Sequence, residues 1–327
     1  MTNRLILAFL MICFLGLQSG CKEETKPSQQ RLHLKRKGRE VPSFSADSAF
    51  KFVKKQLSIG PRNPGSDNHR KAKEYYLEKL GTYAGGALVF QQQFSAKGYG
   101  KDSLHLANIV ASFNPEATER IMLSAHWDTR PRADQDNENK DQPILGADDG
   151  ASGVAVLLEL ARLFKNNPPP VGVDIILFDG EDYGREGDSD KYFMGSRYWS
   201  KHPPVEGYDP RFAILLDMVG GTNAEFPKEK YSTHYAPAVV NEIWAIAEET
   251  SAGRFVDRAG GAVSDDHVII NRITGIPTID IIRQHESTDG TSFAPYWHTH
   301  DDNIDIIDKH TLKEVGAVLA ELIYNRL

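Results

Sequence analysis

Cysteine is nearly absent from this chain of 327 residues, which contains only Cys13 and Cys21. Both lie in the first 21 residues, so the rest of the chain has no thiol with which to form a disulfide. A disulfide-stapled scaffold is therefore excluded for that part. A chain of this length can instead be stabilised by one large hydrophobic core.

Positive charge is also in the minority, with 38 Lys and Arg residues against 45 Asp and Glu residues. The formal net charge is −7 at pH 7. Nucleic acid as a partner requires clustered positive surface, so this composition argues against it. We find no internal repeat and no low-complexity tract, and residues 45–327 fit one α/β domain with a single core.

The apolar run at the amino terminus, Leu5–Leu17, is shorter than the roughly 20 residues of a membrane-spanning helix. It follows one positive charge, Arg4, and precedes small residues, which is typical of a signal peptide over residues 1–20. The ending Ser19-Gly20-Cys21 resembles a bacterial lipobox. This resemblance implies a lipid on Cys21 that anchors the protein to a membrane of the bacterial cell envelope, on the periplasmic or outer-membrane side. Ordinary secretion with cleavage elsewhere is the alternative.

Residues 21–44 are polar and highly charged, and they lack apolar periodicity. This composition predicts a flexible tether that lifts the domain off the membrane. Its basic residues, from Arg31 to Arg39, could touch anionic lipid, but a solvated linker suits them better.

Apolar periodicity predicts strands that alternate with helices along the domain. Continuous apolar runs suit strands buried on both faces, and spaced apolar residues after a capping residue suit helices. We expect strands at 88–94, 105–113, 121–126, 173–178, 212–216 and 278–282, and helices at 45–57, 66–80, 151–164, 236–249 and 311–327. The alternation predicts a single α/β domain with a twisted, mostly parallel central sheet flanked by helices.

Side chains that bind metal ions lie where these apolar runs end. Asp149 lies in GADDGASG, Glu181 and Asp182 close GVDIILFDGED, and His298 lies in YWHTHDDN. The carboxyl ends of parallel strands meet at one edge of a sheet, where catalytic groups gather. Carboxylates and neutral imidazoles are ligands of catalytic zinc sites. Three further residues of these types close strands or follow them: His126, Asp128 and Asp217.

Each of these features has a structural alternative. Asp149 could be only a helix N-cap, and a single loop histidine such as His298 is usually just solvent-exposed. The pair Glu181-Asp182 could belong to a solvated loop. Two adjacent carboxylates after an apolar strand are more specific, because one can bind metal while the other handles protons. The metal site is therefore predicted from the whole set and not from one residue.

These motifs resemble, in composition and order, those of the zinc aminopeptidase superfamily, which includes the glutaminyl-peptide cyclotransferases. The resemblance spans residues 45–327 and depends on GPRNPGS, AHWD, GADDGASG, FDGED, LLDMVG and YWHT. It implies that Glu181 is the general acid and base. It implies three zinc ligands, Asp149, Asp182 and His298. It also implies two further catalytic carboxylates, Asp217 and Asp265, and a substrate-binding residue, Trp297.

The resemblance leaves two activities open. A cyclotransferase would use one zinc ion to convert the N-terminal glutamine of peptides or proteins to pyroglutamate, with release of ammonia. Trp297 before the histidine, together with AHWDTRP, FDGEDYG and SDDHVIINRITGIP, favours this activity. A di-zinc aminopeptidase would bind a second zinc ion through His126 and Asp217, and GADDGASG is closer to the aminopeptidase form.

The aromatic wall of the substrate pocket is not placed by the resemblance. Animal cyclases have a tryptophan in the loop after the position of Asp182, and this chain has none there. The candidates for the wall are Trp127, Tyr183, Tyr192 and Phe193. A non-catalytic binding ectodomain is a third hypothesis, but such a protein is expected to lose ligands or the general base, and every one is present. We therefore expect the cyclotransferase.

Overall fold

The computed structural model describes residues 32–100, 103–287 and 290–327. Leu32–Leu327 form one compact unit. The predicted signal peptide, the lipidation site Cys21 and the beginning of the predicted tether lie outside the described residues. Among the described residues, no helix is both long and apolar enough to cross a membrane.

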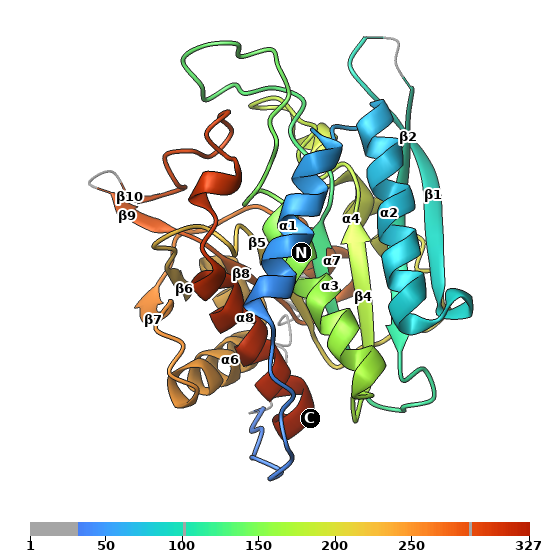
Figure 1. Cartoon of the computed structure of the whole chain (residues 1–327), viewed down its shortest axis with the longest axis vertical. Coiled ribbons are helices and arrows are strands. Elements are labelled where there is room, and N and C mark those ends of the chain that lie inside the picture. Colours follow the sequence, from blue (N-terminus) through green and yellow to red (C-terminus); the bar gives the residue numbers. More distant parts are fainter. Residues whose placement is uncertain (1–31, 101–102, 288–289) are drawn as a thin grey trace, which may run out of the picture. The chain divides into compact units, whose positions relative to one another are not determined.

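A six-stranded sheet forms the centre of this unit (Figure 1). Its spatial order is β1-β2-β4-β3-β5-β8. The strands β4, β3, β5 and β8 run parallel. At one edge β2 pairs antiparallel with β4, and β1 pairs antiparallel with β2. The mostly parallel sheet is thus confirmed. The strands are β1 (Val89–Lys97), β2 (Ser103–Phe113), β3 (Arg120–His126), β4 (Gly172–Phe178), β5 (Ala213–Asp217) and β8 (Thr278–Ile282).

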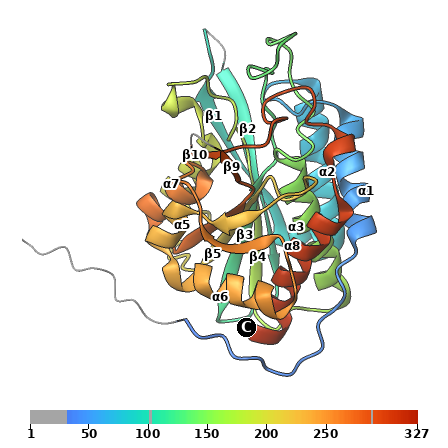
Figure 2. The same cartoon turned by 90° about the vertical axis from the view of Figure 1, so that its left-hand side faces the viewer.

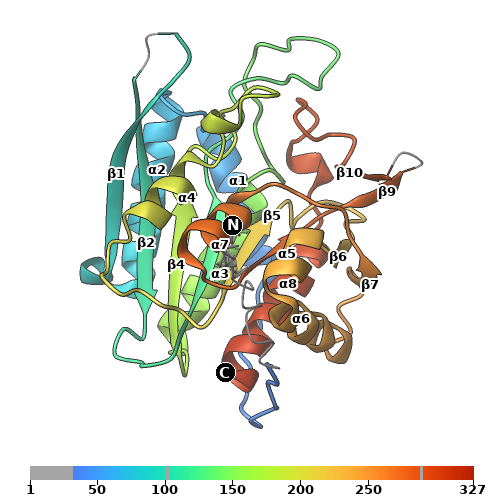
Figure 3. The same ribbon diagram turned by 180° about the vertical axis from the view of Figure 1, so that it is seen from behind.

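Helices cover both faces of the sheet, which Figure 2 shows nearly edge-on between two helical layers. One layer contains α1 (Ala46–Ile59), α2 (Asp67–Ala84), α3 (Ala151–Asn166) and α8 (Lys309–Glu321). The other, in front in Figure 3, contains α4 (Met194–Lys201), α5 (Lys230–Tyr235) and α7 (Asp266–Thr274). The helix α6 (Pro237–Glu249) packs beside α8, and the short parallel pair of β6 (Phe226–Lys228) and β7 (Phe255–Ala259) packs against α6 and β8. A small hairpin is formed by β9 (His285–Ser287) and β10 (Gly290–Ser292).

Successive residues of the central strands face opposite helical layers. In β3, Leu123 belongs to the core cluster that contains the α3 side chains, whereas Met122 packs in the cluster of Trp199 from α4. Because side chains alternate along a strand, burial on both faces requires a continuous apolar run. This is why the runs in the sequence predicted the central strands.

Helix starts follow the predicted capping residues. The hydroxyl oxygens of Ser45 and Ser66 accept hydrogen bonds from the backbone N–H groups of Ser48 and His69, at 3.2 and 3.0 Å. The last helix departs from the expectation, because α8 ends at Glu321 and the chain continues as one π-helical turn. The elements α4, α5 and α7 were not predicted, since helices of 8, 6 and 9 residues have too few turns to show a clear apolar periodicity.

Part of the predicted flexible tether, residues 32–44, packs on the domain. Leu34 and Phe44 are each only 5% exposed. Phe44 lies against Gly316 of α8, and the backbone N–H of Lys37 donates to the carbonyl of Asn325 at 2.7 Å. The prediction of a free tether up to residue 44 is therefore wrong for this part. Two apolar side chains, buried in an otherwise polar stretch, are enough to fix it.

Candidate metal centre

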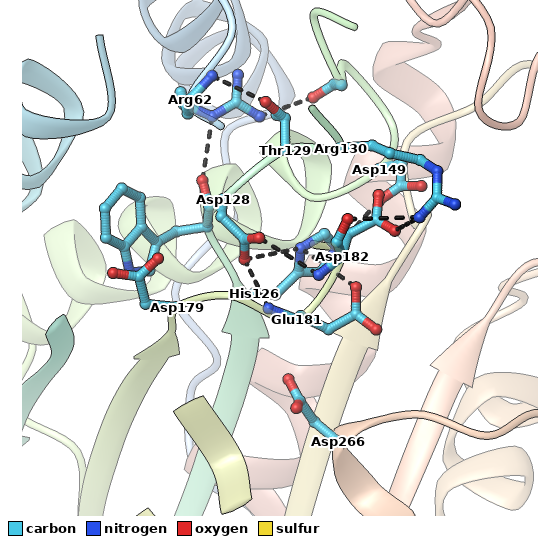
Figure 4. Close-up of polar contacts among 12 residues, drawn as sticks. Arg62, His126, Asp128, Thr129, Arg130, Asp149, Asp179, Glu181, Asp182 and Asp266 are labelled. Atoms are coloured by element: carbon cyan, nitrogen blue, oxygen red, sulfur yellow. Dashed lines mark hydrogen bonds and ion pairs between the residues drawn. The ribbon is translucent and has the colours of Figure 1, made fainter. Parts of the chain in front are cut away.

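The side chains predicted from the strand ends meet at one edge of the sheet. His126 and Asp217 are the last residues of β3 and β5, and Glu181 and Asp182 lie in the loop that follows β4. Asp149 directly precedes Gly150, the N-cap of α3. Figure 4 shows His126, Asp149, Glu181 and Asp182 gathered above the strand ends. The parallel strands therefore assemble the site as expected.

Three groups of buried carboxylates and histidines among the described residues could hold a metal ion, and one of them is Asp265, His267 and Asp280. The other two groups share Asp149. Asp149, Asp182 and His298 form the first of these two, which we call the outer set. The Nε2 atom of His298 lies 3.4 Å from Asp182 Oδ1 and 3.6 Å from Asp149 Oδ2. Tetrahedral zinc with bonds of about 2.0–2.1 Å separates its ligands by roughly 3.3 Å. His298 adopts a left-handed backbone with φ 57°, an uncommon conformation for this residue type that is found at functional sites. The outer set thus has the donor atoms and spacing of a zinc site.

His126, Asp149 and Asp217 form the inner set, which shares Asp149 with the outer one. The Nε2 atom of His126 is hydrogen-bonded to Asp217 Oδ1 at 3.2 Å and lies 3.1 Å from Asp149 Oδ1. A Cβ atom on Gly150 would lie 2.6 Å from the carbonyl oxygen of His126, so this close approach requires glycine. In the inner set, the imidazole is thus hydrogen-bonded to Asp217 and in contact with Asp149.

Unpartnered polar atoms test whether a cation fits the outer set. Asp182 Oδ2 and His298 Nδ1 are buried without a hydrogen-bond partner. Burying a polar atom without a partner is costly, and a cation held by Asp149, Asp182 and the Nε2 atom of His298 would remove this cost for Asp182 Oδ2. The Nδ1 atom of His298 faces the other side, where Asp134 Oδ1 lies 3.6 Å away. The outer set therefore fits a zinc ion. The Nδ1 atom of His126 is likewise buried and unpartnered, although its Nε2 is hydrogen-bonded.

Three carboxyl groups of the site have raised pKa values. Burial, helped by the negative charges of Asp265 and Asp182, raises the pKa of Glu181 well above its ordinary range. Burial also raises the pKa of Asp217 to about 6. For Asp265, burial and then the charge of Asp217 raise the pKa to about 7. Such shifts are typical of groups that hold or transfer protons near neutral pH.

Arg130 is the cation of the site, and the sequence interpretation did not single it out. It is 2% exposed, and its Nη1 donates to Asp182 Oδ1 at 2.6 Å. It also donates to both carboxylate oxygens of Asp134, at 2.7 and 2.5 Å, and to the hydroxyl of Tyr192 at 3.2 Å. Although burial opposes ionisation of Asp182, His298 and Arg130 hold the pKa of this carboxyl well below its usual range.

A second arginine, Arg62, explains the GPRNPGS motif that precedes α2. It is fully buried, and its guanidinium donates to the carbonyls of Trp127, Leu145 and Gly146 at 3.1, 2.8 and 2.9 Å. Arg62 therefore ties together the loops that carry the ligands, as the upper part of Figure 4 shows. An arginine within a turn motif was a visible signal, but its partners are backbone carbonyls that the sequence does not mark.

A cavity of about 530 Å³ opens over the outer set and is also lined by Asp217 of the inner set. Glu181, Asp217 and Asp265 line it together with the outer set. Its aromatic lining comes from Tyr192, Phe193, Phe293 and Trp297. Trp297 stacks on His298 with ring centroids 3.5 Å apart and on Phe293 at 4.5 Å. The lining places Trp297 beside a candidate ligand, where the resemblance had put a substrate-binding residue.

Trp127, in contrast, does not line this cavity, and its predicted role in substrate binding is wrong. Its side chain is fully buried in the main core, its Nε1 donates to the carbonyl of Ala107 at 3.1 Å, and it stacks on His69 at 4.4 Å. Trp127 follows His126 directly, and neighbouring side chains of an extended chain point in different directions. Tyr183 is also absent from the lining and stacks on Tyr99. Of the four candidates for the wall, Tyr192 and Phe193 remain.

Comparison with known proteins places these features in a family. The model of the peptidase family M28 matches residues 108–323. A bovine glutaminyl-peptide cyclotransferase is 26% identical over 79% of this chain and 76% of its own length.

Two solved structures resemble the chain more closely. The glutaminyl cyclase of Bacteroides thetaiotaomicron, bound to N-acetylhistamine, is 46% identical with a TM-score of 0.84, and the match covers 88% of this chain and 100% of that one. A Zn-dependent exopeptidase of Parabacteroides distasonis is 42% identical with a TM-score of 0.83 over the same shares. Solved structures with this fold are therefore named both as a glutaminyl cyclase and as a Zn-dependent exopeptidase.

Proposed function

The chain belongs to peptidase family M28, and on this premise we propose that it is a zinc-dependent glutaminyl-peptide cyclotransferase. It converts the N-terminal glutamine of peptides or proteins to pyroglutamate and releases ammonia. The observation that carries the proposal is the contrast between the two ligand sets. In the outer set the Nε2 atom of His298 lies 3.6 and 3.4 Å from the two carboxylates, whereas in the inner set that of His126 lies 3.1 and 3.2 Å from its two carboxylates and is hydrogen-bonded to Asp217. This contrast supports a single zinc ion, held by Asp149, Asp182 and His298.

The reaction is an attack of the α-amine of glutamine on the γ-carbonyl carbon of the same residue. Because both groups belong to one residue, the pocket mainly has to hold a folded conformer. A zinc ion bound by the outer set would polarise the γ-carbonyl oxygen. The apolar and aromatic lining, with Phe293 and Trp297, suits an uncharged side chain.

Glu181 is the proposed proton carrier. Its carboxyl group lines the cavity and is adjacent in sequence to a proposed ligand, Asp182. Glu181 takes a proton from the attacking amine and returns one to the nitrogen that leaves as ammonia, so no external water is consumed. Asp217 and Asp265, which line the same cavity, are the proposed further catalytic carboxylates.

Peptide hydrolysis is the competing activity, because a similar structure is named as an exopeptidase and the inner set offers a second group of ligands. The test incubates the purified domain with a glutamine-initiated peptide and with leucine- and alanine-initiated controls. A mass loss of one ammonia from the glutamine peptide alone is the expected result. Removal of whole residues, or two tightly bound zinc ions per chain, would refute the proposal.

We further propose that the domain is anchored to the cell envelope through a lipid on Cys21, as the lipobox-like ending suggests. The test expresses the full chain and its Cys21→Ala variant in a bacterium that processes lipoproteins. Membrane association with a lipid-sized mass increase on the first mature residue is expected for the natural chain. An equal distribution of both proteins between membrane and soluble fractions would contradict the anchor.

A further inference from the structure

Two buried carboxylates that have no role in the reaction above each bind two consecutive backbone N–H groups of a ligand loop. Asp302 accepts the N–H groups of Asp148 and Asp149, at 2.7 and 3.2 Å. Asp128 accepts the N–H groups of Glu181 and Asp182, at 3.0 and 3.3 Å. Both side chains are fully buried. We propose that Asp302 and Asp128 are positioning residues, which fix the two aspartate ligands of the outer set by clamping their backbone.

Asp302 connects two ligands of the outer set. It lies in the turn that also carries His298, and its own backbone carbonyl accepts the N–H of Ala147 at 3.3 Å. Its two carboxylate oxygens accept the backbone N–H groups of Asp148 and Asp149, the two residues that follow Ala147. The turn that supplies one ligand therefore fixes the backbone of another.

The Asp149 loop is also held from its other side. The side chain of Asp148 accepts the N–H of Gly220 at 2.7 Å and the hydroxyl of Tyr296 at 2.6 Å. With the side chain of Asp148 bound in this direction, the side chain of Asp149 is presented to the site. The backbone clamp by Asp302 thus decides where a ligand lies without touching the ion.

Asp128 has the corresponding place in the second loop. It follows β3 and binds the loop after β4, and Figure 4 shows its oxygens turned toward His126, Glu181 and Asp182. Its clamp holds both a ligand and the proposed proton carrier. Losing it should therefore affect two functions, whereas losing Asp302 should affect ligand placement alone.

The chemistry of the clamp requires a carboxylate. Both oxygens of an ionised carboxyl group accept hydrogen bonds, while an asparagine of the same shape has one oxygen and a donating NH₂ group. An asparagine at either position would turn this donor toward a backbone N–H, leaving one buried group unsatisfied. Two buried carboxylates would destabilise a purely hydrophobic core, since burying a carboxylate is costly.

The inference rests on the proposed zinc ligation, but not on which reaction the zinc ion supports. The test compares D302N and D128N with D174N as a matched control. Asp174 is also buried, but it binds Arg120, Ser112 and Tyr208, on the amino-terminal side of β4. D174N therefore reports the effect of losing a buried carboxylate away from the site.

The measurement is the zinc dissociation constant of each purified metal-free protein, obtained by competition with a chromogenic chelator without substrate. Losing a residue that orients a metal ligand typically weakens metal binding roughly 10- to 100-fold. We expect this loss in D302N and D128N, and an unchanged constant in D174N. The inference would be overturned if D302N and D128N bound zinc as tightly as the natural protein. It would also be overturned if D174N lost as much zinc affinity as they do.

A variant too unstable to isolate without metal can be measured through the zinc dependence of its unfolding midpoint. Binding to the folded state raises this midpoint, so a weakened site moves the rise to higher zinc concentration. At saturating zinc, D302N should recover its kcat on a glutamine-initiated peptide, whereas D128N should not, because its Glu181 loop is released. Full recovery in D128N would refute the second role of Asp128, while the zinc constants still report on the clamp itself.

Discussion

The outer and inner ligand sets share Asp149 and lie at the same edge of the sheet, yet their surroundings differ. In the outer set, Arg130 donates to one oxygen of Asp182, and the Nε2 atom of His298 lies 3.4 and 3.6 Å from the carboxylates of Asp182 and Asp149. In the inner set, His126 is hydrogen-bonded to Asp217, and the described residues offer Asp217 no other ion-pair partner. Both have a metal-compatible arrangement of donors, but their hydrogen bonding differs.

This difference favours one of the two sets as the metal site. An imidazole that is hydrogen-bonded to a neighbouring carboxylate gains less from a cation than one that lies farther from its carboxylates. We therefore regard the inner set as a hydrogen-bonded support of Asp149 and the outer set as the zinc site. The predictions below test this division, beginning with the largest expected effect.

Replacing Glu181 by glutamine should separate proton transfer from metal binding. The general acid and base is lost, so kcat should fall about 10²- to 10⁴-fold. Glu181 belongs to neither ligand set, so the bound zinc per chain should stay as in the natural protein. Turnover is followed by mass spectrometry and zinc by elemental analysis. Retained activity would exclude Glu181 as the proton carrier, and lost zinc would make it a ligand.

Replacing the two histidines one at a time tests the division directly. H298N removes a proposed ligand, and zinc affinity should fall more than about 100-fold, beyond the effect of losing a supporting residue. H126N removes only the hydrogen-bonded support, so one zinc ion per chain should remain. The zinc dissociation constant should rise by less than about 100-fold.

Zinc content after dialysis against a weak chelator measures both histidine variants, with the natural protein expected to retain one ion. Two ions in the natural protein, and one after H126N, would restore the aminopeptidase arrangement. Equal retention in both variants would instead contradict the assignment of His298.

The sequence predicted the candidate ligands of both sets from two signals. His126, Asp182 and Asp217 end apolar runs or follow them, whereas Asp149 and His298 lie in the motifs GADDGASG and YWHT. Asp149, Asp182 and His298 could therefore be placed together from the strand pattern and the motifs. Arg130 and Asp302 could not, because a buried charge looks like any other polar residue until its partners are known. The prediction that Trp127 lines the substrate pocket failed for a local reason, since the direction of one side chain after a strand depends on how the strand ends. The prediction of a flexible tether failed for residues 32–44, because two buried apolar side chains hold this otherwise polar segment on the domain.

The pH dependence of stability should distinguish the carboxylates beside the inner set. Asp265 lies among Asp217, Asp266 and His267, and burial raises its pKa to about 7 from 3.8. The folded protein then binds the proton more tightly than the unfolded chain. The stability that this proton provides is present below pH 4 and is lost as the pH rises through 7. The loss is about 1.4 kcal/mol for every tenfold difference in proton affinity between the folded and unfolded states.

In the zinc-free state, the free energy of unfolding should accordingly fall less for D265N than for the natural protein between pH 4 and 7. The free energy of unfolding is measured in urea at several pH values. D209N, which changes an exposed aspartate, is the control and should follow the natural curve. Parallel curves for D265N and the natural protein would show that Asp265 is ionised in the folded state.

The smallest effect is expected from D134N, which tests the cation of the outer set. Asp134 accepts both hydrogen bonds from one side of Arg130 and lies 3.6 Å from His298 Nδ1. Without it, the charge of Arg130 is balanced by Asp182 alone, which makes Asp182 a weaker ligand. Asp134 is 29% exposed, so solvent reduces the effect, and zinc affinity should weaken by less than about fivefold. The chelator competition measures this, with Y192F, which removes a neutral partner of Arg130, expected to bind zinc as the natural protein does. Tighter zinc binding in D134N would mean that Arg130 does not compete for Asp182, and the contrast between the two sets would then depend on their histidines alone.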